Sequence, residues 1–559
     1  MLNKYFNKKL ARNCRAGSPH PADKLAYELR SLYITGLLLV FMLTIFSSHT
    51  DTQAATEADS LKAEITVSAS DEVAVIDTRI YGQFIEFLGK CIEGSLWMSE
   101  AEAKGQKLML GGVREDVYRA VKELAVPLLR WPGGCFSDVY NWRDGVGEPD
   151  SRPVRENLHW GGTVKNTFGT DEFLRLCETL GIKPLINVNL GTGTAQEAAD
   201  WVRYVNDPPD KEFGKLRAKN GHPQPYNVKL WGIGNESFGD WEKGDLTAPE
   251  KYAAKYLEFY HAMKEADPNI EFLAVGALGF FHDWNKEVLT RLADYIDYYS
   301  LHIYHPFLEF NGLSDKREMY YVIVSASGDF ENMLTQFESD LLKYAGADTK
   351  IRIALDEWNL IWQKTDSISY GDFELSSGLF AADLLMRLHR HSPRLAFANF
   401  AQLFDPIPLI RVNEDTVFLT PSYLAFIMFS RYAGDRLLKS VVNSPTFSNR
   451  AYASIMPRKD NPLIEVSATT TADRSKLYLM VVNKHYDSPI TTTIKIQDFK
   501  AGATAMIREL NGDSPHAKNT FKMKNEVRIT ETTFPLTGDQ FTYTFPPHSV
   551  TSIEIPAAR

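Results

Sequence analysis

Between residues 80 and 430, short apolar runs rich in β-branched residues alternate with longer amphipathic segments. In segments such as 171–180, 195–206, 249–266 and 376–391, apolar residues recur every three or four positions, which predicts helices with one buried face. Eight strands are predicted, over residues 80–87, 126–131, 183–189, 228–234, 271–275, 296–304, 351–358 and 395–403. Strands that alternate with helices are typical of a parallel sheet. The count favours the α/β class and a closed (β/α)8 TIM barrel, with an open doubly wound sheet as the alternative.

The pattern changes after about residue 431, where strands follow one another without helices between them. Five strands are predicted, over 463–471, 476–483, 491–496, 505–510 and 541–545, and another over 64–68 precedes the barrel. This pattern predicts an additional C-terminal antiparallel β-sandwich. The chain is therefore expected to divide into a leader (1–55), N-terminal strands that join the sandwich (56–79), a barrel (80–430) and the sandwich itself (431–559).

The first 55 residues differ from the rest of the chain. Several Lys and Arg residues precede an apolar stretch from Leu32 to Phe46, and small residues follow at Ala54 and Ala55. This order is typical of a signal peptide, and the apolar run is short for a membrane span. We expect export to the periplasm or the cell exterior with cleavage near Ala55. An uncleaved membrane anchor is the alternative.

Composition narrows the functional classes. The 559 residues carry 61 Lys and Arg against 71 Asp and Glu, a net charge of −10, which argues against a dedicated nucleic-acid binder and favours neutral substrates. Cysteines without a CxxC spacing do not form a zinc-ligand pattern. His302 and His305 lack a recognisable third ligand and no HExxH motif occurs, so no metal site is predicted.

Carboxylates follow two of the predicted barrel strands. The fourth strand ends in Asn235-Glu236, and the seventh contains Asp356-Glu357. Functional side chains of such barrels lie at the carboxyl ends of the strands. Because side chains alternate along a strand, Asp356 and Glu357 are not expected to face the barrel mouth together, so one is catalytic and the other structural.

Glu236 and Glu357 could flank one bond, as the hydrolysis of a glycoside requires. The alternative is that both are surface charges or ion-pair partners, which is the usual role of a single glutamate at a strand end. Their joint occurrence on two strands of one barrel favours the catalytic interpretation.

Several motifs together resemble glycoside hydrolase family 51, whose commonest activity is that of an α-L-arabinofuranosidase. The matching segments are 80–86 (IYGQFIE), 130–136 (RWPGGCF), 188–194 (VNLGTGT), 231–236 (WGIGNE), 354–359 (ALDEWN) and 398–402 (ANFAQ). The resemblance implies that Glu236 is the general acid/base and Glu357 the nucleophile of a retaining hydrolase that needs no cofactor. A nucleophile about 5 to 5.5 Å from the acid would also raise its pKa, as that mechanism requires.

Six further residues are expected to bind the sugar. The resemblance implies this role for Glu86, Cys135 and Gln402, with a buried ion pair, an apolar packing role and a backbone contact as the respective alternatives. His302 and Tyr304 lie two positions apart on one strand face and could fix the nucleophile and an adjoining hydroxyl. Asn235 would bind the sugar 2-hydroxyl, with a strand-end cap as its alternative.

Two loops depart from the family pattern. Residues 237–242 (SFGDWE) replace a frequent Asn-Trp-Gly-Cys-Gly stretch, and 403–406 (LFDP) replace a usual Val-Asn pair. These two differences bear on the prediction of substrate preference rather than on that of the reaction type.

The sequence thus predicts an exo-acting, retaining α-L-arabinofuranosidase that acts on arabinoxylan, arabinan or arabino-oligosaccharides and could assemble as a homo-oligomer. One alternative is a glycosidase of the same family with another sugar preference, such as an endoglucanase or xylosidase. The other is a non-catalytic carbohydrate-binding barrel, which the presence of both glutamates argues against.

Overall fold

The structure is a computed structural model that describes residues 61–279, 281, 283–309, 315–363, 373–452 and 454–558. The expected signal or anchor segment, 1–55, lies outside these residues. Within the described ranges, the helices are all too short or too polar to cross a membrane.

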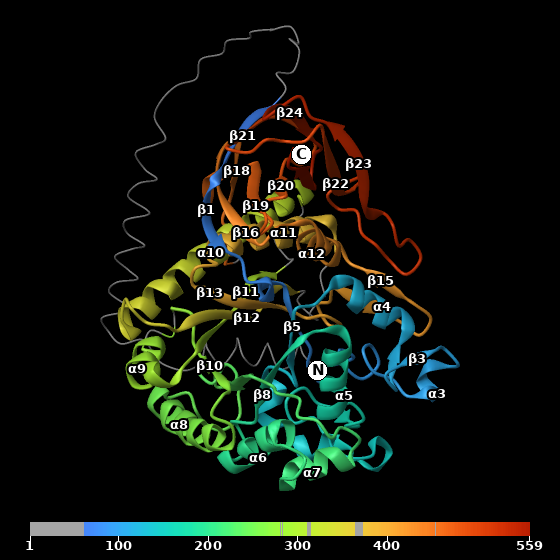
Figure 1. Ribbon diagram of the computed structural model, residues 1–559, viewed down its shortest axis with the longest axis vertical. Coiled ribbons are helices and arrows are strands. Elements are labelled where there is room, and N and C mark those ends of the chain that lie inside the picture. Colours follow the sequence, from blue (N-terminus) through green and yellow to red (C-terminus); the bar gives the residue numbers. More distant parts are fainter. Residues whose placement is uncertain are drawn as a thin grey trace, which may run out of the picture. The chain divides into compact units, whose positions relative to one another are not determined.

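Eight parallel strands form a closed barrel, so the closed (β/α)8 prediction is confirmed and the open sheet is excluded (Figure 1). Around the barrel the strand order is β10-β11-β12-β13-β2-β5-β8-β9. The strands are β2 (Gly82–Phe84), β5 (Leu128–Trp131), β8 (Lys183–Val188), β9 (Leu230–Ile233), β10 (Glu271–Val275), β11 (Tyr298–Glu309), β12 (Arg352–Gln363) and β13 (Leu395–Ala401).

Helices connect these strands and cover the outside of the barrel. In Figure 1, α5, α6, α8 and α9 follow one another around the strands. The main helices are α4 (Glu115–Leu124), α5 (Thr170–Leu180), α6 (Ala195–Asn206), α7 (Glu212–Lys219), α8 (Pro249–Ala266), α9 (Trp284–Leu292), α10 (Lys316–Ala345), α11 (Leu375–Arg390) and α12 (Pro421–Tyr432). Local sequence fixes several ends: Thr194 and Glu197 form a capping box that starts α6, and Gly181 ends α5 with a positive φ of 70°.

An apolar layer fills the barrel at the amino ends of its strands. It contains Leu128, Leu185, Leu230, Leu273, Tyr298, Ala354, Ala396 and Phe397, all buried. Since this layer closes one end of the barrel, polar side chains that point inward collect at the other end. The carboxyl ends of the strands are therefore where the fold can hold a site.

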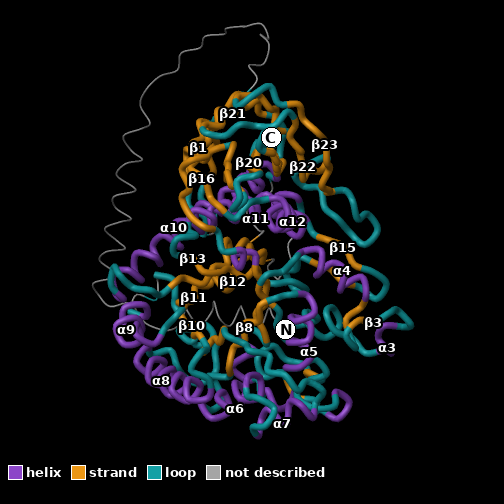
Figure 2. The backbone as a smooth tube through the Cα atoms, in the orientation of Figure 1, coloured by secondary structure: helices purple, strands orange, loops and turns teal. Residues whose placement is uncertain are grey.

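The chain beyond α12 contains strands and loops without helices in the described residues (Figure 2). Its main sheet has nine strands in the order β23-β22-β25-β20-β19-β16-β1-β21-β24. The strands are β1 (Lys62–Val75), β16 (Arg436–Asn443), β19 (Ile464–Thr470), β20 (Lys476–Asn483), β21 (Ile490–Gln497), β22 (Thr504–Gly512), β23 (Val527–Pro535), β24 (Gln540–Phe545) and β25 (Ser549–Pro556). The sheet curls until Phe534 on one edge strand packs against Phe541 on the other, with ring centroids 5.9 Å apart.

The N-terminal strand β1 lies inside this C-terminal sheet. It pairs antiparallel with β16 and parallel with β21. In Figure 1 its blue ribbon runs beside the orange and red strands. The chain therefore starts in the sheet, builds the barrel and returns to the sheet.

Candidate functional site

The structure places the eight sequence-predicted residues at the carboxyl ends of the barrel strands or in the segments that follow them. Glu236 and Glu357 come from β9 and β12, which β10 and β11 separate in the ring. His302 and Tyr304 lie on the intervening β11. The rest are Glu86 after β2, Cys135 after β5, Asn235 after β9 and Gln402 after β13.

Glu357 is held by two donors. The Arg130 guanidinium contacts Oε1 at 2.5 Å, and the Tyr304 hydroxyl donates to Oε2 at 2.6 Å. Burial, and then the charge of Glu357, raise the pKa of Tyr304 well above its ordinary value, so the phenol keeps its proton. A Cβ at Gly134 would lie 2.6 Å from Glu357 Oε1. The carboxylate is thus fixed in orientation with space beside it that only glycine leaves open.

Glu236 is also held at both oxygens. Trp241 Nε1 donates to Oε2 at 2.7 Å, and His302 Nδ1 lies 3.2 Å from Oε1. One carboxylate oxygen of Glu236, one of Glu357 and one ring nitrogen of His302 all lie within 4.8 Å of one another. This separation is somewhat shorter than the roughly 5 to 5.5 Å between the carboxyl groups of retaining glycosidases and well below the roughly 6.5 to 9.5 Å of inverting ones, so it is closer to the retaining geometry.

Asp356 and Glu357 both reach the barrel interior, so the expectation from strict alternation was wrong. Between the partner positions Ser300/Ala354 and His302/Glu357, β12 contains one residue more than β11, which is a β-bulge. Asp356 is 1% exposed and accepts a hydrogen bond from Ser300. Its Oδ1 lies 3.2 Å from His302 Nε2.

His302 is a cation among three carboxylates. Burial lowers its pKa, but the charges of Glu357 and Asp356 outweigh this effect and raise the pKa to about 10. At neutral pH both ring nitrogens therefore carry protons and donate to the flanking oxygens. The same neighbours hold Asp356 ionised: burial raises its pKa, but Arg130 and His302 lower it below its ordinary value.

Arg130 connects the site across the barrel. It is 1% exposed and comes from β5, which lies opposite β11 in the ring. Besides Glu357, its Nη2 donates to Asn235 Oδ1 at 2.8 Å and its Nε lies 3.4 Å from Asp356 Oδ2. One buried guanidinium therefore fixes both candidate acids on β12 and the amide that follows β9.

Asn235 and Glu86 complete the floor of the site. Asn235 Nδ2 donates to Glu242 Oε1 at 3.0 Å and lies 3.8 Å from Cys135 Sγ. Glu86 accepts from the Phe136 backbone N–H at 2.9 Å and from Gln402 Nε2 at 3.3 Å. Burial, and to a lesser degree the charge of Glu357, raise the pKa of Glu86 to about 7.

Comparison with known proteins identifies the family of the chain. Residues 120–320 match the family described as "Alpha-L-arabinofuranosidase 1 domain", and residues 356–549 match "Alpha-L-arabinofuranosidase C-terminal domain". The chain is 34% identical over 451 residues to an intracellular exo-α-L-arabinofuranosidase of Bacteroides ovatus, covering 78% of this chain and 85% of that protein. The chain belongs to the α-L-arabinofuranosidases of glycoside hydrolase family 51.

Other relatives of this family match over most of their length. The α-L-arabinofuranosidase C of Emericella nidulans is 31% identical, covering 87% of this chain and 96% of that protein. The crystal structure of the Thermotoga maritima α-L-arabinofuranosidase in an arabinose complex superposes with a TM-score of 0.80 at 35% identity, covering 89% of this chain and all of that one. The chain is accordingly a glycoside hydrolase.

The site contains four residues to which the sequence analysis assigned no role: Arg130, Trp241, Glu242 and His159. A signal existed for Arg130, since a cation inside an apolar strand must be paired when buried. Trp241 and Glu242 belong to the loop that departs from the usual family 51 pattern. Gly239 leaves room for Trp241 to fold back, because a Cβ there would lie 2.2 Å from the indole.

Two groups of side chains in the described residues have the ligand types and spacing to hold a metal ion. One is Glu236, His302 and Glu357, at the centre of this family 51 site. The other is Cys135, His159 and Glu242, beside it.

Proposed function

We propose that this family 51 enzyme is a retaining, exo-acting α-L-arabinofuranosidase with Glu357 as nucleophile and Glu236 as acid/base. The observation that carries the proposal is the pair of carboxylates, held by separate donors, whose oxygens lie within 4.8 Å of each other. This spacing leaves room for direct attack on the sugar but little for an intervening water.

In the first step, Glu357 attacks the anomeric carbon while Glu236 gives its proton to the departing oxygen. In the second step, Glu236 takes a proton from water, which displaces Glu357 and returns the original configuration. Arg130 and Tyr304 hold both oxygens of Glu357 in place for the attack. Fixing a nucleophile in this way lowers the entropic part of the activation free energy.

The side chains around Glu236 and Glu357 bind the sugar. Glu86, with its two donors already in place, accepts hydrogen bonds from furanose hydroxyls, and Gln402 supplies an amide beside it. Asn235 binds the hydroxyl next to the anomeric carbon, and the thiol of Cys135 packs against the ring. His302 and Tyr304 position the two catalytic carboxylates.

The decisive test is removal of the nucleophile. Glu357→Ala should lose turnover of nitrophenyl α-L-arabinofuranoside, and azide should restore part of it with inverted product, because the small anion enters the vacated space. Asp356→Ala is the matched control and should not be rescued. Rescue of Asp356→Ala in place of Glu357→Ala would show that the wrong acid has been assigned.

The natural substrates are arabinose-containing polysaccharides or oligosaccharides, such as arabinoxylan and arabinan. The support is membership of the family and an acidic chain suited to uncharged substrates. A panel of nitrophenyl α-L-arabinofuranoside, β-D-xyloside and β-D-glucoside should give turnover of the first compound at least tenfold above the others. Preference for either of the others would contradict the assignment of the sugar.

Residues 1–55 direct export, on the strength of their basic and then apolar order. One relative is named as intracellular, so the location of this chain needs its own measurement. Fractionation of the native host should place the enzyme outside the cytoplasm with an N-terminus near residue 56. Light scattering on the same material measures whether it forms the expected homo-oligomer.

A further inference from the structure

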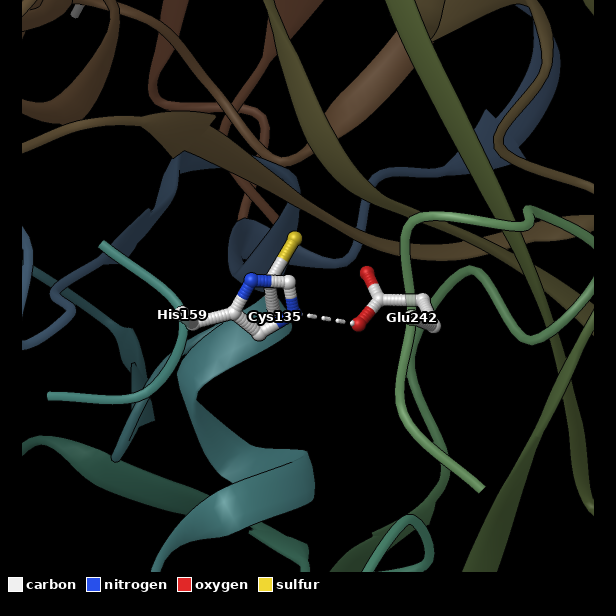
Figure 3. Close-up of side chains that lie close together, drawn as sticks. All are labelled: Cys135, His159 and Glu242. Atoms are coloured by element: carbon white, nitrogen blue, oxygen red, sulfur yellow. Dashed lines mark hydrogen bonds and ion pairs between the residues drawn. The ribbon is translucent and has the colours of Figure 1, made fainter. Parts of the chain in front are cut away.

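Beside the candidate catalytic pair, a thiol, an imidazole and a carboxylate converge from three segments that are distant in the sequence. Cys135 begins a short 3-10 helix after β5. His159 lies between β6 (Arg155–Glu156) and β7 (Thr163–Val164), and Glu242 lies between β9 and α8. Figure 3 shows the three side chains close together, with a dashed line between His159 and Glu242. One potential ligand atom from each lies within 4.8 Å of the other two.

These contacts are built into the fold rather than made at the surface. The side chains of His159 and Glu242 are 0% and 2% exposed. His159 Nε2 lies 2.9 Å from Glu242 Oε2, and the backbone N–H of His159 donates to Asn157 Oδ1 at 3.1 Å, which fixes the loop. Cys135 is only partly buried. The His159–Glu242 part of the group is therefore rigid.

The surrounding charge favours a cation. Glu86 and Glu236 lie close enough to act electrostatically on both Cys135 and His159, and together they outnumber the one cation, Lys243, that acts on His159 in the opposite sense. The guanidinium of Arg130 is already engaged with Glu357 and Asn235. Cysteine sulfur, imidazole nitrogen and a carboxylate oxygen form a ligand set that suits Zn²⁺ and similar thiophilic ions.

We propose that Cys135, His159 and Glu242 bind a thiophilic divalent cation of the Zn²⁺ class through one atom each. As the metal–sulfur bond forms, the thiol proton leaves to solvent. The metal takes the place of the Nε2 proton that now joins His159 to Glu242, and that proton moves through solvent to Nδ1, so that the imidazole stays neutral. Three protein ligands leave a fourth position, which water or a sugar hydroxyl fills.

The bound ion should compete with the sugar. Asn235 Nδ2 contacts both Cys135 and Glu242, so a metal here occupies the edge of the space assigned to the arabinose ring. This consequence rests on the proposed function, whereas binding of the metal does not. The site is therefore expected to make the enzyme reversibly sensitive to Zn²⁺ rather than dependent on it.

Metal binding is tested directly on the full chain with Co²⁺, whose thiolate charge-transfer and d–d bands lie at wavelengths where the protein is otherwise transparent. Titration should give one thiolate–metal band per chain. Cys135→Ser should abolish the band, and His159→Gln and Glu242→Gln should each weaken binding about tenfold or more. Cys177→Ser is a matched control that should keep it. Thermal melts of all variants without metal show which have folded.

Competition is tested by the KM for nitrophenyl arabinofuranoside with and without Zn²⁺. KM should rise with Zn²⁺ at constant kcat, and a chelator should reverse the rise. In Cys135→Ser the ratio of the two KM values should return to about one, whatever the activity of the variant itself.

Two results would overturn parts of this inference, and a third would overturn the proposed function alone. An unchanged thiolate–metal band in folded Cys135→Ser rejects the site. Zn²⁺ inhibition that persists in Cys135→Ser places the inhibitory ion elsewhere, such as at Glu236, His302 and Glu357, and rejects competition through this group. If the chain cleaves no arabinofuranoside but the band behaves as expected, the proposed function fails and the metal site stands.

Discussion

At the scale of single residues, the two glutamates are expected to respond differently to the leaving group. As general acid, Glu236 must protonate a sugar alkoxide, but nitrophenolate leaves almost unaided, so with that substrate only the base-assisted second step suffers. Glu236→Ala should therefore lower kcat/KM on arabino-oligosaccharides by at least about hundredfold more than on nitrophenyl arabinofuranoside. Stopped-flow absorbance should show a burst of nitrophenol. Equal losses on both substrates without a burst would mean that Glu236 has a structural role.

The ionisation of Glu86 is expected to be visible in the pH dependence of kcat/KM. Because burial raises its pKa to about 7, the carboxylate that accepts the sugar hydroxyls forms only as the pH rises through that value. The kcat/KM of the wild type should rise with pH in this range. Glu86→Gln cannot titrate, so its profile should lose this limb and lie about tenfold to hundredfold lower, the effect of one charge-assisted hydrogen bond. A limb near pH 7 that survives in Glu86→Gln belongs to another group.

The sequence was a good guide to residues that follow strands and a poor guide to those that cross the barrel. Glu236 and Glu357 could be located because a pair of acids at the ends of two barrel strands favours a catalytic role over a structural one. Arg130 was missed because its partners lie on β9 and β12, and such contacts between distant strands depend on closure of the barrel. The orientation of Asp356 was predicted wrongly because a β-bulge is not visible in the alternation of residue types.

At the scale of elements, the turn after β5 determines how close the backbone comes to the nucleophile. Gly134 starts the 3-10 helix Cys135–Val139, and a Cβ there would lie 2.6 Å from Glu357 Oε1, well inside contact distance. Gly134→Ala should shift the carboxylate and lower kcat by about hundredfold, the usual result of a misplacement near 1 Å. Kinetics on the activated substrate measure this loss.

Gly279→Ala is the matched control, because a Cβ at Gly279 has no heavy atom within 4 Å. That variant should keep its activity. Full activity in Gly134→Ala would show that the turn can move away from Glu357 without consequence.

The strands that the sequence located have buried, continuous apolar runs, such as β13, where every residue is buried. Those it missed lack this signal. Most residues of β23 are exposed or half-buried, with polar Thr and Glu side chains on both faces, so neither alternation nor an apolar run marks it. β1 extends to Val75, beyond the predicted strand, because its second half is largely exposed and held by pairing with β16. Such exposed strand segments are held by pairing within the sheet. That pairing cannot be read from the local pattern of apolar and polar residues.

At the scale of the whole molecule, the barrel and the C-terminal sheet share a buried ionic cluster. Arg387 on α11 contacts Glu331 on α10 and Glu465 on β19, and Lys484 lies 2.9 Å from Asp383. Burying such charges costs free energy unless all are paired, and each of these three ion pairs joins two different parts of the chain. The barrel and the C-terminal sheet therefore stabilise each other. The sheet supports the structure of the barrel rather than forming an independent domain.

The order of the chain leads to a prediction about its N-terminus. The compact unit that holds the barrel and the sheet begins at Leu61. A chain of residues 56–559 should therefore be soluble without detergent, melt within about 2 °C of the full-length enzyme and keep its kcat/KM.

A chain of residues 77–559 lacks β1, an interior strand in which Ile65 and Val67 are 0% exposed. Its removal leaves the backbone groups of β16 and β21 unpaired and opens the core, so this chain should not fold. Soluble yield, circular dichroism melts and turnover compare the two truncations. If 77–559 is as stable as 56–559, β1 does not support the sheet. If 56–559 is insoluble while the full chain is active in membranes, residues 1–55 act as an anchor rather than a cleaved signal.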